Sequence, residues 1–118
     1  QNPNSYGFVV YIPKDSSYAK AVADRETYKS YANAFLEEMK KATGVNKGSV
    51  ASNNDFTGNN WAKMPCFLVE MGYMSNPLED YLTSDPAYQD TLVKGMVEGV
   101  AEFCKLRGIE LADTKKAN

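Results

Sequence analysis

The sequence of 118 residues contains no histidine and only two cysteines, Cys66 and Cys104. Without histidine, this chain alone cannot build a Ser-His-Asp triad, a Cys-His pair or a histidine-containing metal site. Two cysteines are also too few for a zinc site with four thiolate ligands. The residue counts therefore exclude these kinds of site from a function carried by this chain alone.

Basic residues are not in excess either. The chain has 13 Lys and Arg against 15 Asp and Glu, a formal net charge of −2. This balance does not predict a basic surface that would bind nucleic acid or an anionic membrane, so we expect neither as a partner. The apolar runs are a few residues long, far short of a membrane span. No charged segment followed by an apolar one marks a signal peptide, and from the start at Gln1 we expect a cropped or processed chain.

What the chain does have is the composition of one globular domain. Hydrophobic residues make up 43% and charged residues 24% of the sequence, and this length suffices for a single core. We expect residues 1–111 to form one folded unit and the polar tail 112–118 to be disordered.

The most informative stretch runs from Met64 to Asp80. Its apolar run Cys66–Val69 predicts a strand buried on both faces of a parallel or mixed sheet. Glu70 follows the run, and Gly72 permits a change of direction. In open α/β sheets, ligands bind outside the carboxyl ends of strands, so Glu70 is the candidate functional residue.

The flanking segments predict the rest of an α/β fold. Beyond the central strand, Asn76-Pro77 with Glu79 is typical of a helix start, with an N-cap, a proline at N1 and a carboxylate at N3. Apolar spacings of three and four predict two long amphipathic helices. The expected elements are a strand at Tyr6–Ile12, a loop or a few helical turns at 14–23, and helices at Arg25–Ala42, Asn76–Leu82 and Pro86–Leu106. We therefore predict a small mixed or parallel sheet flanked by two long helices.

Several residues leave alternatives open. Residues 45–63 have few apolar anchors, so we predict that they form the longest irregular segment of the chain. Asp55 is of note in this segment. Trp61 could stack on a substrate or pack under the loop, and Lys63 could contact a substrate carboxylate or be solvated. The tyrosines of the first long helix could stack on sugars or belong to the core. Cys66 and Cys104 could be two buried free thiols or form a disulfide, since both could reach one core.

Two motifs resemble a known family. The stretch Pro-x-x-Leu-Val-Glu-x-Gly-Tyr-x-Ser-Asn-Pro-x-Glu-Asp, which begins at Pro65, together with Asp55–Trp61, resembles the C-terminal half of zinc-dependent N-acetylmuramoyl-L-alanine amidases of the amidase-3 type, which are cell-wall hydrolases. The likeness covers roughly residues 1–107 and is densest at 55–80. It implies a three-layer α/β fold of the phosphorylase/hydrolase-like type, and it places the family's catalytic glutamate on Glu70.

The resemblance also implies a reaction. Glu70 would act as general base toward a zinc-activated water and pass the proton to the leaving amine, which would cleave the amide between N-acetylmuramic acid and L-alanine in peptidoglycan. The family's zinc ligands, two histidines and a glutamate, precede the matched region, and no residue here matches them. We therefore expect zinc in the complete domain, no cofactor in this chain, and no activity from the chain by itself. The location implied is extracellular, at the cell wall of a bacterium that secretes the protein.

Other interpretations remain. From its spacing alone, Glu70 could be a solvated or paired carboxylate that ends a strand. The chain could be a non-catalytic amidase-like module that binds wall peptides or a partner protein, or an unrelated small α/β interaction domain if the central motif is a coincidence. We also expect the Tyr6–Ile12 strand to expose an edge, which would pair with another chain or force a rearrangement.

Overall fold

The computed structural model describes residues 2–53 and 55–109. Within them the chain forms, in order, β1 (Phe8–Ile12), α1 (Ser17–Val22), α2 (Arg25–Thr43), β2 (Gly48–Ser52), α3 (Thr57–Asn60), β3 (Leu68–Glu70), α4 (Pro77–Ser84) and α5 (Pro86–Leu106). No helix among these residues has the length and apolar character needed to cross a membrane. The tail predicted at 112–118 lies outside the described residues.

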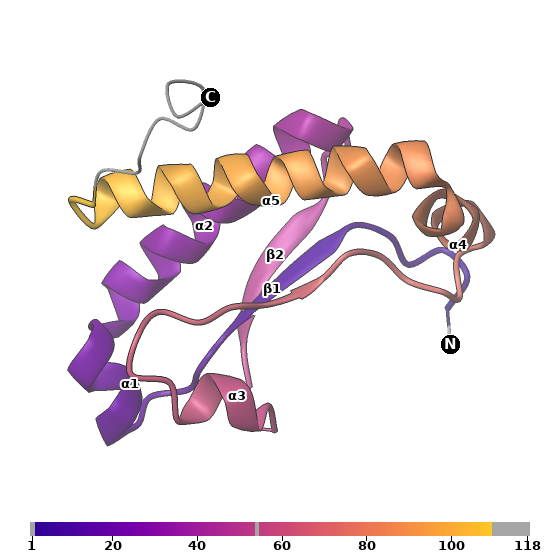
Figure 1. Cartoon of the computed structure of the whole chain (residues 1–118). Helices are drawn as coiled ribbons and strands as arrows, with labels where there is room; N and C mark the ends of the chain where they lie inside the picture. The colour runs from indigo at the N-terminus through magenta and orange to yellow at the C-terminus, as the bar shows by residue number, and fades with distance from the viewer. Residues whose placement is uncertain (1, 54, 110–118) are drawn as a thin grey trace.

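The three strands form one mixed sheet in the order β2-β1-β3 (Figure 1). β1 runs parallel to β2, with Phe8 opposite Gly48, and antiparallel to β3, with Val9 opposite Glu70. The prediction that β1 exposes an edge is therefore wrong, because β2 and β3 occupy both of its edges. Within the described residues the outer edges belong to β2 and β3, where pairing with another chain stays a prediction.

One face of this sheet carries the core. Phe8, Val10 and Ile12 alternate along β1 and are each at most 2% exposed, as the twofold period of a strand requires. They pack against the predicted stripe of α2 and against Leu92 of α5. The stripe consists of Tyr28, Tyr31, Ala32, Phe35, Leu36 and Met39, which are all buried, and all of them except Tyr31 belong to the cluster around β1. Both long helices therefore lie on the same face of the sheet, and the tyrosines of α2 belong to the core.

The two long helices pack closely because α5 carries glycines at their contact. A Cβ atom on Gly99 would lie 2.6 Å from the ring of Phe35, and one on Gly95 would lie 3.1 Å from Met39. The predicted start of α2 at Arg25 is confirmed, and the helix ends at Thr43, one residue beyond the predicted Ala42. Asp24 accepts a hydrogen bond from the Thr27 N–H at 2.9 Å, and Gly44 ends the helix with φ 74°. These caps satisfy terminal backbone groups locally.

The prediction of an irregular segment at 45–63 is wrong, because β2 and α3 lie inside it. β2 has the sequence Gly-Ser-Val-Ala-Ser and lacks the aromatic and branched residues that mark most strands. β2 pairs with β1 at a place where α2 packs closely on the strand, since a Cβ atom on Gly48 would lie 2.7 Å from Leu36. Close approach to a helix, rather than strand propensity, selects glycine here.

The central strand also differs from its prediction. β3 covers Leu68–Glu70 rather than Cys66–Val69, and its residues are half-buried rather than buried on both faces. The reason is its position: β3 pairs with β1 alone, and the described helices α2 and α5 cover one face. Cys66 precedes the strand and donates its backbone N–H to the Tyr28 hydroxyl at 2.9 Å. Both thiols are free, with Cys104 buried and Cys66 half-buried.

Candidate functional site

Glu70 is the last residue of β3 and lies on the face of the sheet that the long helices leave open. Its neighbour Val69 packs against the core under the helices, and successive side chains of a strand point to opposite faces. The pairing of Glu70 with Val9 therefore places its carboxylate on the same face as Val9 and Tyr11. Glu70 is half-buried in this position.

The position of Glu70 in the sheet differs from the one predicted, which was a crevice outside the carboxyl ends of neighbouring strands. Glu70 does lie at the carboxyl end of its own strand, but β3 is antiparallel to β1. The carboxyl end of β3 therefore meets the amino ends of β1 and β2, and the rule for parallel strands does not apply to it.

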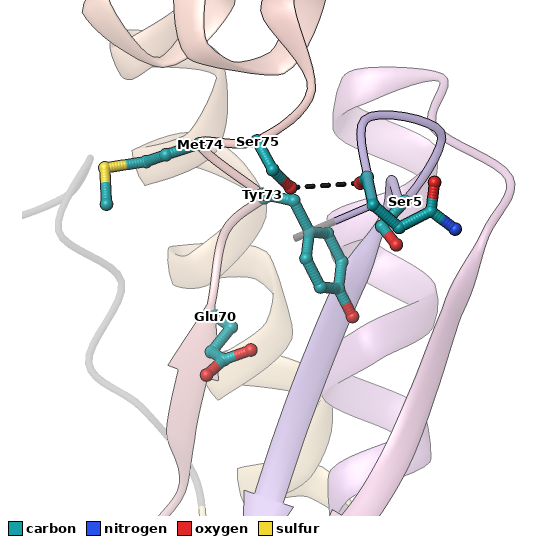
Figure 2. A pocket seen from close by; sticks show the side chains of 7 residues that line it. Ser5, Glu70, Tyr73, Met74 and Ser75 are labelled. Carbon is teal, nitrogen blue, oxygen red and sulfur yellow. Dashed lines mark hydrogen bonds between the residues drawn. The ribbon is translucent and has the colours of Figure 1, made fainter.

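A pocket of about 540 Å³ nevertheless opens at Glu70. One wall is the segment before β1, and the other is the loop that follows β3 (Figure 2). The lining residues are Asn2, Ser5, Glu70, Gly72, Tyr73, Met74 and Ser75. The Ser75 hydroxyl donates to the backbone carbonyl of Asn2 at 3.1 Å, which joins the two walls. The carboxylate thus stands in a concave, partly polar site, as most ligand sites are.

The start of α4 holds the loop after β3 as the sequence predicts. The Asn76 side chain accepts hydrogen bonds from the N–H groups of Leu78 at 3.0 Å and Glu79 at 3.2 Å, and Pro77 stands at N1. Each of the two bonds satisfies one of the free donors at a helix start. The N-cap role assigned to Asn76 is therefore confirmed.

Glu79 makes contacts that its predicted position at N3 does not account for. Its carboxylate accepts hydrogen bonds from the backbone N–H groups of Gly7 and Tyr73, each at 2.6 Å. Nothing in the sequence predicted Glu79 as part of the site. The only local signal was a glutamate shortly after the glycine at position 72, which is too common to single out, and the other donor, Gly7, lies 72 residues away in the sequence.

Two tyrosines complete the surroundings of Glu70. The pKa of Tyr11 is raised from its ordinary value, first by burial and then by the negative charge of Glu70 and by Tyr73. Tyr11 therefore keeps its proton at neutral pH and can donate a hydrogen bond. A carboxylate beside phenol groups in a pocket can accept a proton from a reacting group, which is the task of a general base.

Metal ligands are the next feature to look for among the residues that the structure describes. The described ranges 2–53 and 55–109 contain no group of three or more His, Cys, Asp and Glu side chains placed to hold an ion. Catalytic zinc needs three protein ligands in most enzymes. Three such ligands do not come together in this part of the chain.

The residues of note at 55–63 lie elsewhere. Trp61 follows α3 and is 62% exposed, with its ring 5.3 Å from that of Tyr18 in α1. The interpretation that it packs under the loop is wrong. Because α1 follows the carboxyl end of β1, this aromatic pair stands at the opposite end of the sheet from Glu70, and Trp61 does not line the Glu70 pocket. Asp55 and Lys63 are exposed.

The chain is similar to several proteins named as amidases. A family model described as N-acetylmuramoyl-L-alanine amidase (Amidase_3) matches residues 1–102. The Staphylococcus epidermidis protein named "Probable cell wall amidase LytH" is 27% identical over 100 residues, which are 85% of this chain and 30% of that protein. An N-acetylmuramoyl-L-alanine amidase of Mycobacterium tuberculosis is 31% identical over 68 residues, 58% of this chain and 28% of that protein.

Solved structures share the fold. The CwlD amidase of Clostridioides difficile, in complex with the GerS lipoprotein, superposes with a TM-score of 0.75 at 22% identity, over 90% of this chain and 50% of that one. The amidase Ami1 of Mycobacterium smegmatis gives a TM-score of 0.71 at 23% identity, over 92% of this chain and 50% of that one. The chain thus spans about half of these structures and under a third of the curated relatives.

Proposed function

We propose that this chain, which belongs to the N-acetylmuramoyl-L-alanine amidase (Amidase_3) family, is the C-terminal portion of a catalytic domain that hydrolyses peptidoglycan. Residues 1–111 form that portion. The bond cleaved is the amide between N-acetylmuramic acid and the L-alanine of the stem peptide. Glu70 is the catalytic residue in this proposal.

The position of Glu70 carries the proposal. It is the carboxylate that ends β3 and opens into the pocket between the segment before β1 and the loop after β3. Hydrolysis of an amide needs a base that takes a proton from the attacking water and returns it to the leaving nitrogen. A half-buried carboxylate in a pocket can do both, and general acid-base catalysis contributes about 10²- to 10⁴-fold to a rate.

The rest of the pocket wall has a binding role. The pocket offers hydroxyl and amide groups from Asn2, Ser5 and Ser75 beside the exposed apolar side chain of Met74. A muramyl peptide presents both amide groups and alkyl side chains, so it could be held by such a mixed surface.

Zinc belongs to the proposal only through residues outside this chain. The 118 residues contain no histidine, so the ligands must come from elsewhere in the protein encoded by the complete gene. Metal analysis of that protein tests this: we expect one zinc per polypeptide, and a metal-free protein with full activity would contradict it.

Cleavage of purified peptidoglycan tests the activity. The protein from the complete gene should release peptides that begin with L-alanine, detectable by labelling new amino termini. Glu70→Gln keeps the size of the side chain and removes its ability to accept a proton as a carboxylate, so we expect at least about 100-fold less product per unit time. Wild-type activity in the Glu70→Gln variant would reject Glu70 as the base.

The site of action follows from the same proposal. A peptidoglycan hydrolase works at the cell wall, so we place this protein outside the membrane of the bacterium that secretes it. The wall fraction of fractionated cells should contain the protein, and confinement to the cytosolic fraction would contradict this placement.

A second candidate is a non-catalytic amidase-like module that binds wall peptides or a partner. The 118 residues supply no histidine ligand, so the enzyme needs ligands from another segment of the protein, whereas a binding module does not. The discriminating observation is the sequence encoded upstream in the gene: two histidines and a glutamate at strand ends favour the enzyme, whereas other residues at those positions favour the binding module. Retention of muropeptide by a protein that releases no new amino termini would also favour the module.

A further inference from the structure

Glu79 connects two segments that are distant in the sequence. Its Oε1 atom accepts a hydrogen bond from the Gly7 N–H, just before β1, and its Oε2 atom accepts one from the Tyr73 N–H, in the loop after β3. Both donor–acceptor distances are 2.6 Å. Hydrogen bonds with a charged acceptor are short and stronger than neutral ones. One carboxylate thus binds both of the segments that form the walls of the Glu70 pocket.

The start of α4 fixes where this carboxylate stands. In a capping box, a glutamate at N3 would turn back to the N-cap N–H. Here the Asn76 N–H instead donates to the Tyr73 carbonyl at 2.9 Å. The Asn76 side chain and Pro77 set the first turn, which leaves both oxygens of Glu79 available for the two loops.

Glycines on both sides allow the close approach. A Cβ atom on Gly72 would lie 3.0 Å from Oε2 of Glu79. Gly7 has φ 104°, and a Cβ atom there would overlap the carbonyl oxygen of Lys47. Gly72 thus leaves room for the carboxylate, and Gly7 lets the segment before β1 take a positive φ where it passes Lys47.

We propose that Glu79 is a positioning residue for the amidase reaction, one that sets the distance between the segment carrying Asn2 and Ser5 and the loop that follows Glu70. This rests on the proposed function. A general base must lie within hydrogen-bond reach of the proton that it takes, and a displacement of about 1 Å can cost about 100-fold in rate. Glu79 acts on the rate by holding Glu70 and the opposite wall in register, without touching substrate.

Steady-state kinetics on a soluble muropeptide, with the protein from the complete gene, test the proposal. Glu79→Ala removes both acceptors, and Glu79→Gln keeps one acceptor but turns an NH₂ group toward an N–H donor. We expect kcat to fall about 100-fold for Ala and about 10-fold for Gln, with KM within about twofold. Asp80→Asn is the matched control, because Asp80 is exposed in the same helical turn and its loss removes the same charge; its kcat should stay within about twofold.

Amide hydrogen exchange provides a readout that does not depend on activity. In the Glu79 variants the Gly7 and Tyr73 N–H groups should exchange at least about 10-fold faster, while amides of α2 keep their protection. Unchanged exchange at both sites, or a KM rise with unchanged kcat, overturns the proposal. If the wild-type protein cleaves no muropeptide, the proposed function fails, and the exchange rates alone decide whether Glu79 holds the two walls.

Discussion

The two ends of the sheet differ in how their side chains are held. At the end where β1 begins, Glu70 opens into a pocket whose walls are joined by Ser75 and Glu79 through hydrogen bonds to backbone groups. At the other end, Trp61 and Tyr18 pair with each other and remain 62% and 47% exposed. The Trp61 side is conspicuous in the sequence, whereas at the polar end Glu70 lines a concave site.

The two ends show that an exposed side chain is not the same as a side chain held in place for catalysis. An exposed aromatic pair offers area but no fixed polar group, whereas a general base must be held in place relative to its substrate. Single exposed apolar side chains are ordinary on protein surfaces. We therefore expect substitutions at the Glu70 end to lower kcat and substitutions at the Trp61 end to leave kcat and KM nearly unchanged.

The largest expected effect contrasts the two ends directly. Glu70→Gln should lower kcat on a muropeptide at least about 100-fold, whereas Trp61→Ala should leave kcat and KM within about twofold. Both side chains are partly exposed, so neither change should lower the thermal midpoint by much. A large rise in KM for Trp61→Ala would show that substrate reaches across the sheet and would break the comparison.

The next effect concerns stability at the Glu70 end. Gly7→Ala adds a Cβ atom that overlaps the Lys47 carbonyl at a positive φ, and we expect a loss of about 2–3 kcal/mol in the free energy of unfolding. Gly44→Ala is the control, since Gly44 also has a positive φ but nothing lies within 4 Å of its Cβ position, and it should lose about 1 kcal/mol. Equal losses in urea denaturation would contradict the close approach.

A smaller effect tests how the opposite end is anchored. Asn59 is 4% exposed, and its side-chain amide donates to the Tyr11 carbonyl at 3.1 Å. Asn59→Ala leaves that acceptor without its donor, so we expect a loss of about 1–2 kcal/mol in the free energy of unfolding. The kcat value, measured well below the thermal midpoint, should not change by more than about twofold. A loss of kcat beyond this range would show that α3 supports the Glu70 end as well.

The smallest effect is electrostatic. Burial is the first cause that raises the pKa of Tyr11, and the charge of Glu70 is the second. Glu70→Gln removes that charge, so the Tyr11 pKa should fall but stay above its ordinary value. An NMR titration of the Tyr11 ring carbon measures this, with Trp61→Ala as the control that leaves the titration unchanged. No shift, or an upward shift, would contradict a Glu70 carboxylate directed toward Tyr11.

The same pKa has a consequence for stability. Because the folded state raises the Tyr11 pKa above that of the unfolded chain, the neutral phenol favours the folded state. Its contribution is complete below the unfolded pKa of about 10 and is lost as the pH rises through the folded pKa. Tyr11→Phe should therefore flatten the loss of stability with pH in this alkaline range, as denaturation at several pH values can show.

Much of the fold followed from local patterns. The predicted helix at 25–42 ends one residue later, at Thr43, and the predicted strand at 6–12 begins two residues later, at Phe8. The helix prediction rests on apolar spacing and on residues at the helix end, and the strand prediction rests on a run of β-branched and aromatic residues that a proline ends. All of these are signals from residues close together in the chain. Glu70 was found the same way, as a carboxylate at the end of an apolar run, and its role as base remains a proposal.

Other features depended on residues far apart. β2 was missed because its small residues carry little strand propensity, and its pairing depends on β1 and on Leu36 above Gly48. The burial of β3 was overestimated because an apolar run cannot show whether a strand lies at an edge. The contacts of Glu79 were missed because one of its donors lies 72 residues away.

By itself, the sequence determined the helices with their caps and the carboxylate that ends the central run, because these depend on side chains a few residues apart. Only the tertiary structure decided that β1 is the central strand, that Glu70 meets the amino ends of its neighbours, and that Glu79 joins the two walls of the pocket. The physical reason is range: strand pairing and hydrogen bonds between loops depend on which segments meet in space, and local residue patterns do not record that.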